Sequence, residues 1–307
     1  EVVAYLEAEN SYTEAQTEHL APLREAIFEE IRSRTQETDM SVPTRMGNWW
    51  YYARTVEGKQ YAIQCRCPIA DADDWTPPNV TPGVELPGEQ VLLPDPEFPN
   101  WRMAAVAAGL DVGTYPTRAA HGFVPRVEDV ERAIGPRTRA IVVCSPNNPT
   151  GAVYPRAVLE GICEVARRHD LWVLSDECYD EFTFDDPHVG LTGLDRDDRV
   201  LTFFSFSKTH AMTGWRVGYA VVPDPTVRDL MGHLAEATIS CPSTIGQRAA
   251  LAALTGPQDH VTAARDAYRA RRDAAVALLA ARGIGCVRPA GAFYLMVDVS
   301  SATSDSE

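Results

Sequence analysis

Three clusters of polar residues hold the side chains in this sequence that could do chemistry. They cover residues 145–151 (SPNNPTG), residues 176–179 (DECY) and residues 205–216, which begin with SFSK and end with TGWR. Together they offer a lysine, a carboxylate, a phenol, an amide and an arginine. A lysine amine can bond covalently to a carbonyl carbon, and the planar fork of arginine suits phosphate. These groups form one site only if the three clusters meet in space.

The elements around the clusters predict that they do meet. From about residue 91, short apolar runs alternate with amphipathic helices. The expected strands cover 140–144, 171–175, 200–204 and 217–222, and the expected helices cover 156–169, 226–238, 243–254 and 257–282. This alternation predicts an α/β fold with a mostly parallel sheet and helices on both faces. Ligands of such sheets bind beyond the carboxyl ends of the strands, where each cluster falls.

The order and spacing of the clusters resemble those of class I/II aminotransferases, which are pyridoxal-phosphate (PLP) enzymes of fold type I. Residues 91–101 (VLLPDPEFPNW) match the same family, and the resemblance covers about 91–299. It implies the large domain of that fold, with PLP as cofactor and a reaction that moves an amino group between an amino acid and a 2-oxo acid. It also allows a homodimer. The amino-acid substrate stays open.

The resemblance implies a role for each of seven residues. Lys208 would bind the cofactor covalently and then shuttle the proton during catalysis. Asp176 would keep the pyridine nitrogen protonated. The other implied cofactor contacts are Asn148 and Tyr179 at the ring hydroxyl, Ser205 and Arg216 at the phosphate, and Phe98 stacked on the ring.

Each of these residues also has a plainer interpretation when its motif is ignored. Lys208 could be a solvated charge and Asp176 a helix N-cap. Tyr179 and Phe98 could be core aromatics, and Arg216 could belong to a surface ion pair. The family pattern favours the functional interpretation for all five.

Three features depart from the family pattern. The Gly- and Ser/Thr-rich turn that cradles the phosphate is expected in the window 61–77, and no such turn occurs there. The arginine that clamps the substrate carboxylate is expected some tens of residues after the segment 291–294 and is not found before Glu307. His210 stands where an aromatic residue such as Phe is expected, which we interpret as a packing change. The first two departures predict an incomplete large domain and impaired transamination.

Residues 1–93 resemble a different family. Segments 3–10, 49–54 and 87–93 are similar to the N-terminal region of oligopeptidase B, a relative of prolyl oligopeptidase. Helical spacing predicts two helical segments or a kink at Pro22 within residues 1–40, followed by a β-hairpin over 49–54 and 61–66 and a loop over 68–90. The expected domains are therefore 1–90, 91–260 for the PLP-binding part, and 261–307 for a linking helix with a truncated small domain.

The two resemblances meet at residues 91–93, which predicts a chimeric chain. Two alternatives to an active aminotransferase stay open. One is a non-catalytic remnant. The other is a fragment of a prolyl-oligopeptidase-family serine peptidase without its catalytic domain, because no Gly-x-Ser-x-Gly nucleophile turn occurs in the sequence.

The charge and the cysteine content of the chain limit which classes of partner and which cellular location are expected. The chain has 28 basic and 43 acidic residues and a net charge of -15, which disfavours nucleic acid and anionic membranes as partners. No apolar run is long enough for a membrane span. Seven scattered cysteines give no complete zinc site, so no metal is expected, and they favour a reduced, cytoplasmic protein. No secretory leader is visible, although the sequence begins at Glu1 instead of Met.

Overall fold

A computed structural model describes residues 2–59, 61–69, 71, 73, 75 and 88–300. The chain divides into two compact units, Glu1–Leu86 and Pro87–Glu307, and each is described by itself. Most of the loop predicted over 68–90 lies outside the described residues. No helix in the described part of the chain is long and apolar enough to cross a membrane.

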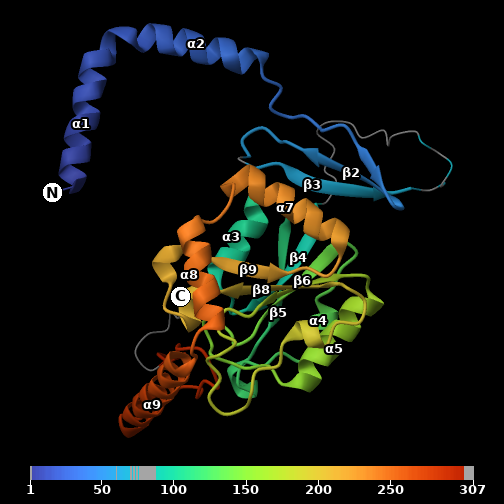
Figure 1. Cartoon of the computed structure of the whole chain (residues 1–307). Coiled ribbons are helices and arrows are strands. Elements are labelled where there is room, and N and C mark those ends of the chain that lie inside the picture. Colours follow the sequence, from blue (N-terminus) through green and yellow to red (C-terminus); the bar gives the residue numbers. More distant parts are fainter. Residues whose placement is uncertain are drawn as a thin grey trace. The chain divides into compact units, whose positions relative to one another are not determined.

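The first unit contains two helices and a small antiparallel sheet (Figure 1). Helix α1 (Val2–Thr17) is followed by the 3-10 turn η1 (Glu18–Leu20) and by α2 (Ala21–Arg34). The chain thus changes helix type just before Pro22, which takes its favoured place in the first turn of α2. The prediction of two segments near this proline is confirmed.

The predicted hairpin forms, and a third strand extends it. Strand β2 (Trp49–Arg54) pairs with β3 (Ile63–Pro68), and β1 (Thr44–Met46) pairs with the other edge of β2. Trp50 and Tyr52 alternate with less buried neighbours along β2 and are buried, as is Cys65 of β3. One face of this sheet therefore carries the apolar side chains.

The second unit is built around a six-stranded sheet in the order β5-β4-β6-β7-β8-β9. Its strands are β4 (Gln90–Asp95), β5 (Asp111–Pro116), β6 (Thr138–Cys144), β7 (Trp172–Asp176), β8 (Val200–Ser205) and β9 (Gly218–Val221). The first five are parallel, and β9 is antiparallel to β8. The predicted α/β fold with a mostly parallel sheet is confirmed.

Helices cover both faces of this sheet, as predicted (Figure 1). The helices of the unit are α3 (Pro99–Ala107), α4 (Val127–Arg132), α5 (Arg156–Arg168), α6 (Phe206–Thr209), α7 (Pro225–Ile239), α8 (Thr244–Thr255) and α9 (Asp259–Ala281). On one face, Ile141 and Val173 of the strands pack with Ile162 of α5. On the other face, Leu93 packs with Ala105 of α3. Because successive residues of a strand point to opposite faces, the fully apolar run of β6 supplies both layers.

Candidate active site

The three polar clusters meet at one edge of the sheet. Strands β6, β7 and β8 are parallel neighbours, and their register places Asp176 opposite both Cys144 and Phe203. The ladder continues past the strand ends, because the Ser145 amide donates to the Asp176 carbonyl at 3.2 Å. The convergence expected from the sequence is therefore what the strand order and register produce.

Asp176 is the buried carboxylate of this edge, with 8% of its surface exposed. Its two oxygens accept hydrogen bonds from the indole Nε1 of Trp101 at 2.9 Å and from the Cys178 amide at 3.2 Å. Trp101 also packs edge-on against Phe203, with ring centroids 5.8 Å apart. A carboxylate has about four lone-pair positions, so Asp176 can still accept a hydrogen bond from a protonated ring nitrogen.

The neighbouring acid, Glu177, holds the end of β7 in place and was not singled out from the sequence. It is 2% exposed and lies in a network of three partners. Its carboxylate accepts hydrogen bonds from the Ser175 hydroxyl at 2.8 Å and the Leu191 amide at 2.9 Å, and it contacts His188 Nε2 at 2.7 Å. Such a fully partnered buried group makes the strand end rigid.

Lys208 lies on the four-residue helix α6, directly after β8. The Ser205 hydroxyl caps this helix by accepting a hydrogen bond from the Ser207 amide at 3.1 Å. The Lys208 amine lies 5.9 Å from the ring centroid of Tyr179 and 5.5 Å from that of Phe293. It therefore faces the rings of Tyr179 and Phe293, which we call the aromatic wall, at the ends of the strands.

The Cys178 thiol lies within electrostatic range of both Asp176 and Lys208. Burial raises the pKa of this thiol most strongly, the Asp176 carboxylate raises it further, and the Lys208 amine lowers it. Both charges are thus close enough to act on one sulfur atom.

Tyr179 is 4% exposed and hydrogen-bonds through its hydroxyl to the Tyr294 hydroxyl. Its ring meets Phe293 edge-on at 5.2 Å. Burial, followed by the hydrogen bond between the Tyr179 and Tyr294 hydroxyls, raises the pKa of Tyr179 well above its usual value. The phenol therefore stays protonated and can act as a hydrogen-bond donor at neutral pH.

The other predicted site residues lie at the same edge with looser arrangements. Asn148 is half-buried, and its backbone lies close enough to the Cys144 thiol to lower a pKa that burial raises. Phe98 is half-buried at the start of α3, where its carbonyl accepts a hydrogen bond from the Trp101 amide at 3.1 Å. Arg216 is exposed, adopts a left-handed backbone (φ 53°), and donates to the Thr213 carbonyl at 3.1 Å.

The pairing of β9 with β8 brings Arg216 close to the carboxyl end of β8. It comes two residues before Gly218, which is paired with Ser205 in the antiparallel β8–β9 ladder. In this structure the Arg216 guanidinium is hydrogen-bonded to the Thr213 carbonyl, within the turn that precedes it. Reaching a phosphate beside Ser205 requires the side chain to leave that carbonyl.

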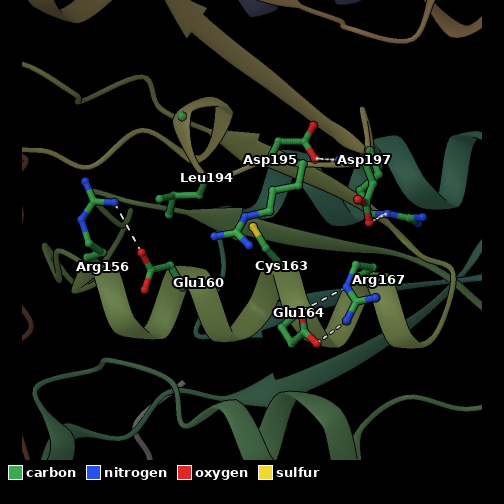
Figure 2. A pocket seen from close by; sticks show the side chains of 11 residues that line it. Arg156, Glu160, Cys163, Glu164, Arg167, Leu194, Asp195 and Asp197 are labelled. Atoms are coloured by element: carbon green, nitrogen blue, oxygen red, sulfur yellow. Dashed lines mark hydrogen bonds and ion pairs between the residues drawn. The ribbon is translucent and has the colours of Figure 1, made fainter.

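A cavity away from these residues lies between α5 and residues 193–199 (Figure 2). It measures about 540 Å³. Its arginines and acids largely neutralise one another, as in the pairs Arg156–Glu160 at 3.4 Å and Arg167–Glu164 at 2.5 Å. None of the predicted site residues lines it. We interpret it as a solvated hollow between ion pairs and not as the reaction site.

Comparison with known proteins identifies the family. Residues 84–307 match the family described as "Aminotransferase class I and II". The chain belongs to this family. Its members depend on PLP. Lys208, Asp176 and Tyr179 have residue types that suit this cofactor, and they lie at the ends of the adjacent strands β7 and β8. Residues 1–97 match the N-terminal β-propeller domain of prolyl oligopeptidase. The two matches overlap at 84–97, which supports the prediction of a chimeric chain.

The relatives of the aminotransferase part share about two fifths of its residues. The aspartate/prephenate aminotransferase of Thermus thermophilus is 40% identical over 230 residues, which are 74% of this chain and 59% of the relative. The arginine–pyruvate transaminase of Pseudomonas aeruginosa is 40% identical over 69% of this chain and 54% of its own length. The solved structure of Thermus thermophilus aspartate aminotransferase with maleate matches with a TM-score of 0.69 and 41% identity. It covers 72% of this chain, which spans 58% of that structure.

Proposed function

We propose that the second unit binds PLP at the carboxyl ends of β6, β7 and β8 and transfers an amino group between an amino acid and a 2-oxo acid. One observation supports this proposal most strongly. The buried Asp176 ends β7, Lys208 follows the adjacent parallel strand β8, and the Lys208 amine lies 5.9 Å from the ring centroid of Tyr179, three residues after Asp176. A lysine amine and a buried carboxylate at one edge of the sheet are the two groups that a pyridine aldehyde requires.

Each residue has a task that its contacts support. When bound, PLP supplies a ring that accepts electrons from the substrate carbon. Lys208 holds the cofactor through its amine and, once released, carries a proton at the substrate carbon. Asp176, fixed by the Trp101 indole at 2.9 Å, keeps a proton on the ring nitrogen. The protonated Tyr179 phenol donates a hydrogen bond toward the ring hydroxyl.

We further propose that phosphate binding is weak. Ser205 already caps α6, and Arg216 is exposed. The glycine-rich turn expected in the window 61–77 is absent from the sequence, and residues Ile63–Pro68 form strand β3 instead. Backbone amides at a helix start normally supply several phosphate hydrogen bonds. With each charge-assisted bond worth about 1.5–3 kcal/mol, their absence lowers PLP affinity by orders of magnitude.

We also propose domain bounds, substrates, an oligomeric state and a location, from the sequence and from the family of the chain. We propose that residues 1–90 supply no cofactor ligand, that 91–260 form the PLP-binding part, and that 261–307 hold a linking helix and a truncated small domain. The substrates are one amino acid and one 2-oxo acid, and the unit pairs as a homodimer. A reducing, cytoplasmic setting suits a chain with seven scattered cysteines.

The test combines binding with turnover. PLP is titrated into the full chain while visible absorbance is recorded, and amino donors are then added while 2-oxo acid is measured. We expect a new absorbance band that Lys208→Ala abolishes and Lys59→Ala leaves intact, because Lys59 and Lys208 are the two lysines of the chain. We expect slow 2-oxo acid formation. A band that survives Lys208→Ala contradicts the assignment, and rapid turnover contradicts the proposed weakness.

A second candidate is a chain that binds PLP without turnover. The match of residues 1–97 to a β-propeller domain favours it, because that part of the chain is similar to a family other than the aminotransferases. A PLP band without any 2-oxo acid product over hours would support it. Peptidase activity is not proposed, since the sequence lacks a Gly-x-Ser-x-Gly turn.

A further inference from the structure

Two histidines face each other beside α6, outside the residues assigned to PLP. His210 follows α6, two positions after Lys208, and His260 lies in the first turn of α9. His210 Nδ1 is 3.2 Å from His260 Nε2, and the ring centroids are 5.4 Å apart. The residues are separated by 50 positions in the sequence, so the fold alone brings these nitrogens together.

The separation of the two nitrogens matches that of imidazoles that share a metal ion. Zinc-to-nitrogen bonds measure about 2.0–2.1 Å. At coordination angles between about 90° and 109°, two such bonds place their nitrogens about 2.9–3.4 Å apart. The observed 3.2 Å, at which the two nitrogens are hydrogen-bonded here, lies inside this interval, so an ion would replace this hydrogen bond and turn both rings toward itself.

The protonation pattern also suits metal binding. His260 Nδ1 lies 3.2 Å from the Pro257 carbonyl, which accepts the proton of that nitrogen and leaves a lone pair on Nε2. Metal-binding histidines commonly donate their second nitrogen to a carbonyl in this way. When an ion binds, neutral His210 carries its proton on Nε2 and frees Nδ1. Two neutral imidazoles then act as ligands with no net release of protons.

The surroundings are acidic and leave room for water ligands. Asp180 and Glu181 line a hollow of about 260 Å³ together with His210. Among the described residues, no group of three or more His, Cys, Asp or Glu side chains is arranged to hold a metal. The site therefore supplies two protein ligands, and water fills the remaining positions.

We propose that His210 and His260 form a two-imidazole site for one divalent late transition ion, such as Zn²⁺, Ni²⁺ or Cu²⁺. Imidazole nitrogen suits these three ions. The ion would join the end of α6 to the start of α9, and so connect the Lys208 helix to the long C-terminal helix. The site is independent of PLP and of the proposed transamination.

The experiment titrates Ni²⁺ into the full-length, untagged chain by calorimetry, without PLP. His210→Gln and His260→Gln each remove one ligand, and His233→Gln, a single exposed histidine on α7, is the matched control. We expect one equivalent of Ni²⁺ to bind to the wild type and to His233→Gln. Chelation by two linked ligands predicts a loss of about a hundredfold in affinity in either single variant.

The double variant distinguishes a shared ion from two separate sites. If one ion is shared, each single variant loses the stoichiometric site, whereas two separate sites would leave one equivalent bound in each single variant and none in His210→Gln combined with His260→Gln. Circular dichroism checks folding, and the exposed His260 provides the deciding variant if His210→Gln does not fold. Wild-type affinity in His260→Gln, or no stoichiometric binding by the wild type, overturns the proposal.

Discussion

Arg272 offers a test of how the aromatic wall beside Lys208 is held in place. This arginine of α9 has a side chain that is only 4% exposed. It donates to both carboxylate oxygens of Asp185 at 2.8 and 3.3 Å, to Asp273 at 2.9 Å and to the Pro289 carbonyl at 3.0 Å. Its guanidinium also lies 4.8 Å from the ring centroid of Phe184.

These contacts support the segment that carries Phe293 and Tyr294. An isolated bridge pairs Thr183 with Gly291, so the segments 182–185 and 289–294 lie against each other. Arg272 binds both segments from α9. Replacing it would loosen the support for the Phe293 ring that the Lys208 amine faces at 5.5 Å.

We predict that Arg272→Met destabilises the second unit by about 2–4 kcal/mol. The buried Pro289 carbonyl loses its donor, which costs about 1–3 kcal/mol. The two aspartates are 41% and 49% exposed and can rehydrate, so each lost pair adds only about 0–1 kcal/mol. Methionine keeps most of the packing on Phe184. For a unit of this size the loss corresponds to a melting temperature lower by roughly 5–15 °C.

The assay is thiol labelling during a temperature ramp, read peptide by peptide. Cys144 lies in β6 and is 1% exposed, so its labelling reports the opening of the second unit alone. Arg269→Ala is the control, because Arg269 lies on the same helix but pairs with Asp266 at 2.9 Å while 47% exposed. A shift in Arg272→Met no larger than in Arg269→Ala would refute the supporting role of Arg272.

Two further predictions concern stability. Burial raises the pKa of Asp180 to about 6 from an ordinary value of 3.8, so its folded state favours the neutral carboxyl, and stability falls as pH rises through that range. The free energy of unfolding of Asp180→Asn, measured with urea, should therefore equal that of the wild type below pH ~4 and exceed it by about 2 kcal/mol at pH ~7.5. Equal free energies of unfolding at both pH values would contradict this. Ile162 is 0% exposed, and Ile162→Ala should cost about 2–5 kcal/mol. Ile245→Ala, at a 73% exposed position, should cost less than about 0.5 kcal/mol; similar unfolding midpoints for the two variants would be inconsistent with the described core.

The central strands β6 and β7 of the second unit were predictable because they are apolar on both faces, whereas β4 and β5 were not among the expected strands. The expected strands 140–144 and 171–175 correspond to β6 (Thr138–Cys144) and β7 (Trp172–Asp176). Continuous apolar runs of this length between amphipathic helices leave few other arrangements. Strand β1 was not expected, because its three residues, Thr44–Met46, show too short a pattern to reveal a period.

The contacts within the site were much less predictable than its location. Trp101 and Asp176 are 75 positions apart, and neither residue type indicates that they share a hydrogen bond. The segment 91–101 pointed to Phe98 as the aromatic of interest, whereas the hydrogen bond to the carboxylate comes from Trp101, one turn later. His210 was noted as a departure, but its partner His260 depends on where α9 begins in space. Long-range side-chain pairs of this kind follow from packing and not from local sequence.

The most direct measurement of the central claim is the location of covalently bound PLP. The full chain is incubated with PLP, reduced with borohydride to make the bond permanent, and digested for mass spectrometry. Because the sequence contains two lysines, Lys59 serves as an internal control for Lys208. The account predicts that the label is on Lys208 at PLP concentrations that leave Lys59 unmodified. Equal labelling of both lysines, or labelling of Lys59 alone, would contradict it.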